Sequence, residues 1–330
     1  MLSSSFFESA HFQDGKYKNQ HPPEKDLSFY KLMFGFLREQ RDIWPYPIEN
    51  VSTPEFRTAA DKADEVVVTF INHATFLIQV KNLTIITDPV FAKRVGPFGI
   101  GPKRHRDPGA SIRELPPIDI ITVSHNHYDH MDIKALRTLQ KKHDCPIIVS
   151  MGNKRFLEKK GLKNITELNW GDQYVDQTRT FSVTATPAQH GSGRSVFDQN
   201  DTLWCGYIYS LPETTVYHAG DSGYNTHYKD IGSEFDIDIS FLPIGAYKPG
   251  FLLKYVHQDP FDAAQAHIDL GSTISFPMHY DTFSLAAEGY QETIDEFERA
   301  LEQTSLNEET FKKLHVGQSV RVPVNRPNPL

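Results

Sequence analysis

The chain has 330 residues, of which 39% are hydrophobic and 23% are charged, and its formal net charge at pH 7 is −8. This composition is that of a folded globular protein and excludes a collagen, a coiled coil or a disordered chain. The negative charge argues against attraction of the whole chain to nucleic acid, so we expect no nucleic-acid partner. The two cysteines, Cys145 and Cys205, exclude a disulfide scaffold and favour the cytoplasm.

The first 62 residues are predicted to be an N-terminal arm with one amphipathic helix. Residues 1–24 are polar, lack a secretory signal and are expected to be irregular. Residues 26–41 place apolar side chains at helical spacing, which predicts a helix packed on its own domain. The alternative is an apolar patch that contacts a second subunit or holds the protein at the membrane surface; either a homodimer or peripheral attachment would follow. Residues 42–62 contain three prolines and are expected to be a connector.

From residue 63 to residue 330 the pattern predicts one domain with two clusters of strands, each followed by helices. β-Branched and aromatic runs predict strands at 66–71, 74–80, 83–87, 118–124, 146–150, 181–186, 203–210, 214–219, 237–244 and 273–278. Apolar spacing predicts helices at 132–143, 154–161, 260–269 and 287–303. This order favours an α+β fold in which two sheets pack together with helices outside.

One short segment concentrates side chains that bind metals. His125, His127, Asp129 and His130 fall within six residues, directly after the predicted strand 118–124. A structural role is a poor explanation for them, because buried unpaired polar groups are costly. Imidazole nitrogen and carboxylate oxygen are ligands that Zn²⁺ and similar divalent ions prefer. The segment therefore predicts a metal site.

Three further candidate ligands lie in the same position relative to other predicted strands. His190, Asp221 and His279 each come at or shortly after a strand end, so the strands can bring them to one edge of the sandwich. Seven ligands suit two metals that share a carboxylate, each with an open position for water or substrate. We assign the first metal to His125, His127 and His190, the second to Asp129, His130 and His279, and the bridging position to Asp221.

These ligands and the residues around them resemble the metallo-β-lactamase-fold hydrolases, and most closely the N-acylphosphatidylethanolamine-hydrolysing phospholipase D family. The matching phrases, between residues 66 and 322, are NHATFLI, TDPVF, GPKRHR, SHNHYDH, TPAQH, AGDSGY, PIGAY and HQDPFDA. The HxHxDH pattern alone indicates the superfamily, and its combination with GPKR, TPAQH and PIGAY is more specific. The resemblance implies a four-layer αββα sandwich, the same seven ligands, two Zn²⁺ ions or other divalent metals, and phosphodiester hydrolysis.

The resemblance also implies roles for single residues. It places His257 at the substrate phosphate, where it hydrogen-bonds the phosphate or protonates the departing alkoxide. A hydroxide held between the metals is the expected nucleophile, with Asp129 and Asp221 as the other catalytic residues. Asp88 and His73 are candidates for orienting ligand imidazoles. The implied substrate is an N-acylphosphatidylethanolamine-like phospholipid, cleaved by a phospholipase D type of reaction.

Loops around the pocket depart from the family pattern, with Gly191-Ser192-Gly193 after TPAQH and Lys248 after PIGAY. The main competing hypothesis is therefore a metallo-hydrolase of the same fold that acts on a soluble phosphodiester or a sugar-phosphate lactone. Nucleic-acid processing and a di-iron redox function are weaker hypotheses. The net charge weighs against the first of these, and the chain shows no flavin or electron-transfer module for the second.

Overall fold

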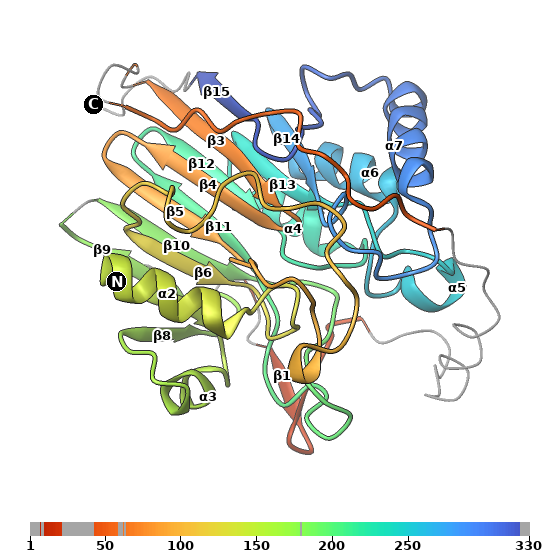
Figure 1. The fold of residues 1–330 in the computed structure, drawn as a ribbon. Coiled ribbons are helices and arrows are strands. Elements are labelled where there is room, and N and C mark those ends of the chain that lie inside the picture. The colour runs from red at the N-terminus through yellow and green to blue at the C-terminus, as the bar shows by residue number, and fades with distance from the viewer. Residues whose placement is uncertain are drawn as a thin grey trace.

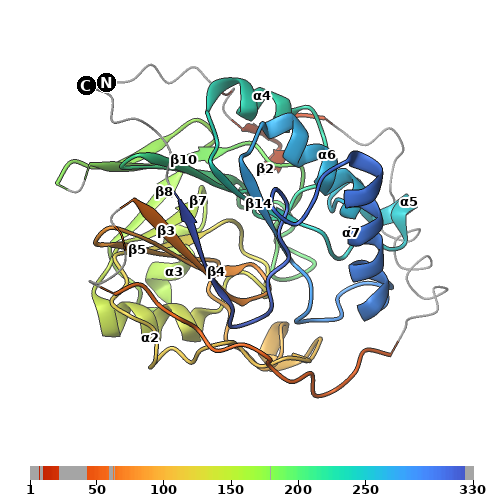
Figure 2. The ribbon, with the colours of Figure 1, turned by 90° about the horizontal axis from the view of Figure 1, so that it is seen from above.

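The computed structural model describes residues 7, 10–21, 43–58, 62, 64–178 and 180–323. Two β-sheets pack face to face, with α2 and α3 outside one sheet and α4, α6 and α7 beside the other (Figure 1, Figure 2). The helices are α2 Ile133–His143, α3 Lys154–Lys159, α4 His227–Glu234, α5 Gly250–Leu253, α6 Pro260–Leu270 and α7 Tyr290–Thr304, and a 3-10 turn, η1, spans Pro97–Gly99. The predicted αββα sandwich is confirmed.

The first sheet has seven strands in the order β15-β3-β4-β5-β6-β7-β8. Their bounds are β3 Glu65–Asn72, β4 Thr75–Val80, β5 Leu83–Thr87, β6 Ile120–Val123, β7 Ile147–Ser150, β8 Ile165–Leu168 and β15 Ser319–Pro323. Strands β5 to β8 are parallel, and β6 and β7 are fully buried. Burial on both faces explains why these strands are continuous apolar runs in the sequence.

The second sheet has six strands in the order β14-β13-β12-β11-β10-β9. Their bounds are β9 Gln173–Asp176, β10 Phe181–Thr186, β11 Gly206–Leu211, β12 Thr214–His218, β13 Ile239–Pro243 and β14 Ile274–Met278. Strands β12, β13 and β14 are parallel, so the loops that follow them leave from one edge of the sheet. Functional residues of such sheets gather on loops at the carboxyl ends of the strands.

The N-terminal segment differs from the prediction. Residues 1–24 were expected to be irregular, but β1 His11–Gln13 and β2 Lys16–Lys18 form an antiparallel hairpin. Asp14 and Gly15 both have positive φ, as a tight two-residue turn requires. The predicted helix at 26–41 lies outside the described residues. Within the described part of the chain, no helix is long and apolar enough to cross a membrane.

Helix α6 contains a buried histidine that couples stability to pH. Burial lowers the pKa of His267 to about 4, and its ring packs on Phe311. In the unfolded chain the same imidazole titrates near its ordinary value of 6.5. As the pH falls below this value the unfolded chain takes up a proton first, so the free energy of unfolding decreases by up to about 1.4 kcal/mol per pH unit until the folded pKa is reached.

We therefore expect the urea midpoint to fall between pH 7 and pH 5, measured by circular dichroism, and His267→Gln to reduce that fall. Equal pH dependence of the variant and the original chain would contradict the assignment.

Candidate metal centre

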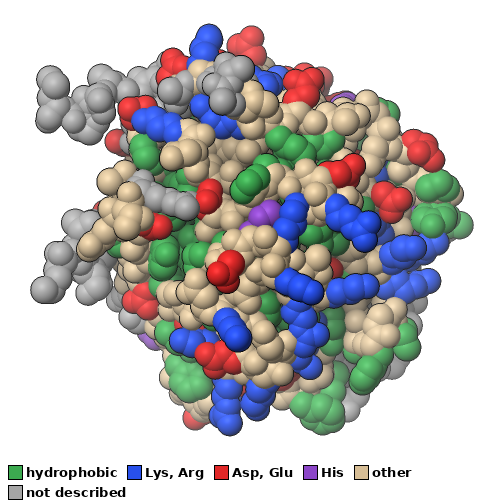
Figure 3. Space-filling view, turned by 60° about the vertical axis from the view of Figure 1, so that its left-hand side comes forward, with side chains coloured by type: hydrophobic (Ala, Val, Ile, Leu, Met, Phe, Trp, Pro, Cys, Tyr) green, Lys and Arg blue, Asp and Glu red, His purple; other side chains and the backbone are tan. Residues whose placement is uncertain are grey.

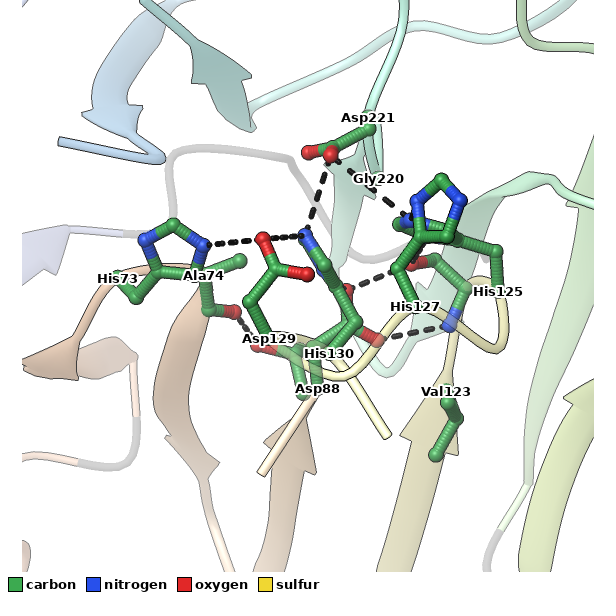
Figure 4. A network of polar contacts seen from close by, with 12 residues as sticks. His73, Ala74, Asp88, Val123, His125, His127, Asp129, His130, Gly220 and Asp221 are labelled. Atoms are coloured by element: carbon green, nitrogen blue, oxygen red, sulfur yellow. Dashed lines mark hydrogen bonds and ion pairs between the residues drawn. The ribbon is translucent and has the colours of Figure 1, made fainter. Parts of the chain in front are cut away.

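The segment with three histidines forms the connection between β6 and α2. Asp132 caps α2 by accepting hydrogen bonds from the backbone N–H groups of Lys134 and Ala135, which fixes the end of this loop. His125 and His130 are completely buried. Figure 4 shows the side chains of the loop directed toward Asp221, which comes from the connection after β12.

The structure brings the three histidines assigned to the first metal site, together with the bridging aspartate, into one cluster. His125, His127, His190 and Asp221 each offer a ligand atom, and these atoms lie within 4.8 Å of one another. His127 Nδ1 lies 2.9 Å from His125 Nε2 and 3.2 Å from His190 Nε2. Asp221 Oδ2 lies 3.8 Å from His125 Nε2 and 3.6 Å from His190 Nε2. The donor atoms therefore surround a common point, as ligands of one metal do.

A second cluster adjoins the first and contains Asp129, His130 and His279, together with His73. Asp221 Oδ2 lies 3.2 Å from His130 Nε2 and 3.1 Å from His279 Nε2, so this one carboxylate reaches both clusters. The structure thus places Asp221 where a bridging ligand would lie.

His73 lies closer to the centre than its predicted orienting role requires. Its Nε2 is 3.1 Å from Asp129 Oδ2, and it shares the cluster geometry of the ligands. The signal in the sequence was its position at the end of β3, which matches the strand-end positions of the other candidates. His73 is therefore a candidate ligand as well as a partner of Asp129.

Buried polar atoms that lack a hydrogen-bond partner gather at the two clusters. Of the sixteen such atoms among the described residues, six belong to the site: His73 Nδ1, His130 Nε2, Asp221 Oδ1, His257 Nδ1 and both ring nitrogens of His279. Leaving such groups unpaired is costly in a folded protein. Bound cations would satisfy them, and a set of imidazole and carboxylate donors suits Zn²⁺ and similar divalent metals. The residues present therefore fit a metal centre.

The pKa shifts show how strongly this site requires positive charge. Burial acts to lower the pKa of His130, but the carboxylates of Asp221 and Asp129 outweigh it and raise this pKa well above 6.5. Against the same effect of burial, Asp221 and Asp129 raise the pKa of His279 to about 9. Burial acts to raise the pKa values of both aspartates, but the surrounding imidazoles hold them well below their usual range. The two carboxylates thus stay ionised and favour positive charge beside them, which protonated imidazoles or bound cations can supply.

Asp88, which follows β5, orients one of the candidate ligands. Its carboxylate accepts hydrogen bonds from His130 Nδ1, from Ser124 N and from Ser124 Oγ, each at 2.7 Å. Because Nδ1 of His130 is engaged in this way, Nε2 is left facing Asp221. The predicted role of Asp88 as a partner of a ligand imidazole therefore agrees with its contacts.

Replacement of Asp88 tests this arrangement. Asn tolerates the positive φ of this position but is a weaker acceptor. We expect Asp88→Asn to weaken metal affinity by about 10- to 100-fold, measured by competition with a chelator. Unchanged affinity would show that Asp88 does not orient His130.

His257 lies at the side of the clusters that is open to solvent. Its Nδ1 is 4.0 Å from Asp221 Oδ2, and its ring centroid is 4.9 Å from that of His190. The side chain is 13% exposed, whereas those of Asp221 and His279 are 1% exposed. Burial lowers its pKa to about 4, so the imidazole is neutral at pH 7. A neutral imidazole at the open side can donate one N–H to a substrate oxygen.

The N-terminal hairpin holds one of the ligands, which the sequence did not reveal. Asn19 Nδ2 donates to the carbonyl of His190 at 2.8 Å, and His190 N donates to Asn19 Oδ1 at 3.0 Å. Trp204 Nε1 also lies 3.0 Å from Asn19 Oδ1. The Asp14-Gly15 dipeptide indicates a turn, but the strands on either side have three residues each, too few for a clear strand pattern.

Two sheets with helices outside and histidine–aspartate clusters at one edge define a metal-dependent hydrolase of the metallo-β-lactamase fold. The chain belongs to the β-lactamase superfamily, whose domain model matches residues 84–280. It is similar to N-acyl-phosphatidylethanolamine-hydrolyzing phospholipase D 1 of Caenorhabditis elegans, with 29% identity over 285 residues that cover 82% of this chain and 79% of that protein. The predicted family likeness is confirmed.

Two further comparisons agree with this assignment. An uncharacterised protein of Mycobacterium tuberculosis is 31% identical over 334 residues, which cover 98% of this chain and 85% of that protein. Among solved structures, an isothiocyanate hydrolase from Delia radicum gut bacteria has a TM-score of 0.62 at 19% identity, and the match covers 78% of this chain and 99% of that one. At this low identity, the likeness to the isothiocyanate hydrolase supports the assignment of the fold alone.

Proposed function

We propose that this protein is a zinc-dependent phosphodiesterase that hydrolyses N-acylphosphatidylethanolamine-like phospholipids in a reaction of the phospholipase D type. The observation that carries the proposal is the pair of adjacent clusters that share Asp221, with His257 at their open side. His125, His127 and His190 would hold one Zn²⁺, and Asp129, His130 and His279 the other. Bound metals of this kind lower the pKa of coordinated water to about 7 and neutralise charge on phosphate oxygens.

The chain's own residues would position the diester. His257 is the least buried member of the group formed with Asp221 and His279, with 13% of its side chain exposed, so a substrate entering from solvent would meet this imidazole. Its N–H would hydrogen-bond a phosphate oxygen, and transfer of a proton to the departing alkoxide would require the imidazolium form, which a bound phosphate anion would favour. The backbone N–H of His257 donates to the carbonyl of Leu253 at the end of α5, which fixes the imidazole next to that helix.

Two observations support a lipid substrate. Phe251, on α5, is 70% exposed, and burial of this side chain against an acyl chain near His257 would be favourable. The relative from Caenorhabditis elegans carries this substrate in its name.

A panel of substrates tests the proposal. The metal-reconstituted protein is assayed with N-acylphosphatidylethanolamine in mixed micelles, with bis-p-nitrophenyl phosphate and with a sugar-phosphate lactone. We expect the highest kcat/KM for the lipid, phosphatidic acid as its product, and two zinc ions per chain by elemental analysis. A preference for the lactone, or no cleavage of either diester, would refute the proposal in favour of another hydrolase of this fold.

A further inference from the structure

One outer face of the molecule concentrates positive charge. Nine basic side chains, all exposed, lie between residues 134 and 163 on α2, α3 and the turns that follow them: Lys134, Arg137, Lys141, Lys142, Lys154, Arg155, Lys159, Lys160 and Lys163. The same stretch has two acidic residues, Asp144 and Glu158, so its local charge is nine minus two, or +7, in a chain of net charge −8. Figure 3 shows Lys and Arg gathered on this face of the molecule. We call these nine residues the α2–α3 face.

The cations of the α2–α3 face form no ion pairs with carboxylates in the part of the chain that the structure describes. Arg137 and Lys142 donate to backbone carbonyls, and Lys160 lies over the ring of Phe156. Like charges held this close repel one another, and the resulting potential attracts a polyanion from solution.

A hollow of about 570 Å³ lies where the α2–α3 face meets the metal loop. The cations that line it are Arg137, Lys160 and Arg194. Its wall also includes Asn126 and Tyr128, which lie in the metal loop between the candidate ligands. Arg194 stacks on Tyr128 at 3.8 Å and donates to the carbonyl of Asn126 at 2.8 Å. The face is therefore continuous with the loop that carries the metal ligands.

The rim of this hollow bears an exposed apolar tip. Ser195 and Asp198 line the hollow, and the two residues between them, Val196 and Phe197, are 69% and 89% exposed. Asp198 accepts hydrogen bonds from the backbone N–H groups of Arg194 and Ser195, which keeps the tip in a defined turn. Burial of these two side chains in lipid would be favourable.

We propose that the α2–α3 face docks on an anionic phospholipid membrane. Its cations lie against lipid phosphates, the hollow accepts one headgroup phosphate, and Val196 and Phe197 enter the interface between the lipids. Clustered Lys and Arg beside an inserted apolar tip combine the two signals that hold peripheral proteins on membranes. A nucleic acid would satisfy the charge but would leave the tip exposed. The inference rests on the proposed function, since Asn126 and Tyr128 of the metal loop line the hollow and the substrate of that function is itself a membrane lipid.

Vesicle sedimentation tests the proposal. The metal-reconstituted protein is mixed with vesicles of phosphatidylcholine alone, or with about one third phosphatidylglycerol. We expect binding to the anionic vesicles only, and weaker binding as salt rises. Arg155→Glu/Lys159→Glu reverses two charges on α3 and is expected to reduce the partition coefficient about tenfold or more. Lys229→Glu/Arg299→Glu makes the same change of net charge on exposed positions of α4 and α7, and is expected to bind like the original chain.

The apolar tip gives a second, independent variant. Val196→Ser/Phe197→Ser leaves the charge intact and is expected to lower binding most at high salt, where the electrostatic attraction is screened. Equal losses for the α3 and the control charge reversals would overturn the proposal. So would tighter binding to a single-stranded RNA than to the anionic vesicles at the same salt concentration.

Turnover of bis-p-nitrophenyl phosphate by the original chain separates the two proposals. Hydrolysis without vesicle binding refutes the docking proposal alone. Vesicle binding without hydrolysis of any diester refutes the proposed function and leaves the docking surface standing.

Discussion

Asp221→Ala is expected to remove bound metal and to lower phosphodiester turnover by at least about 10³-fold, while the chain stays folded. The reason is the position of one oxygen atom. Asp221 Oδ2 lies within 3.8 Å of nitrogens on His125, His130, His190 and His279, so no other carboxylate of the site reaches both clusters as it does. Without it, the first cluster has no carboxylate and the second keeps only that of Asp129, so both lose negative charge that would hold cations.

The fold is expected to tolerate the change. Asp221 raises the pKa values of His130 and His279, so its removal allows these imidazoles to become neutral and leaves fewer buried charges. Elemental analysis, thermal unfolding and turnover of bis-p-nitrophenyl phosphate measure the three outcomes. Asp230→Ala, which removes an exposed carboxylate from α4, is the matched control and should keep metal and activity. Full turnover by Asp221→Ala would exclude the shared-carboxylate centre.

The helices and strands that could be predicted from the sequence are those whose pattern of apolar residues matches the burial of their side chains. Every strand and helix predicted from residue 66 onward overlaps an observed element. β6 and β7 are buried on both faces, so their sequences are runs of β-branched residues. The neighbouring helices instead have apolar residues at helical spacing, so the two kinds of element are easily distinguished. The ligand candidates were recognisable because strands that run in the same direction end at a common edge of the sheet. Polar residues that directly follow such strands therefore lie at that edge.

Strands β1, β2, β8, β9 and β15 and helices α4 and α5 were not predicted, and several of the strands lack such a signal. β9 and β15 alternate weakly and are only partly buried, and the hairpin β1–β2 has one buried side chain, that of Tyr17. Their strand structure depends on pairing with distant residues, as in the pairing of β15 with β3. A window of sequence does not contain that information.

The same reason explains what was missed at the site. The hydrogen bonds between Asn19 and His190 join residues 171 positions apart, and no spacing rule links them. His73 was predicted to orient a ligand, yet it shares the geometry of the second cluster. Whether a histidine binds the metal or only orients a ligand depends on differences in position of about 1 Å. Packing sets these differences, and residue type does not.

His257→Ala is the second decisive variant, and it is expected to lower kcat by about 10²- to 10⁴-fold without loss of metal. His257 is the least buried member of the group that it forms with Asp221 and His279, and its Nδ1 lies 4.0 Å from Asp221 Oδ2, farther than the corresponding atoms of His130 and His279. The assigned ligand His125 lies 3.8 Å from the same oxygen, so the metal content of the variant, and not this distance, decides whether His257 is a ligand.

Metal content and kinetics distinguish these roles. His190→Ala is the matched control, because His190 is adjacent to His257 but belongs to the first cluster, and its loss should remove metal. If His257→Ala also loses metal, His257 is a ligand and the group it forms with Asp221 and His279 is part of the centre. If metal is kept and KM rises while kcat is unchanged, its hydrogen bond binds ground state and transition state equally, and proton transfer to the alkoxide must come from elsewhere.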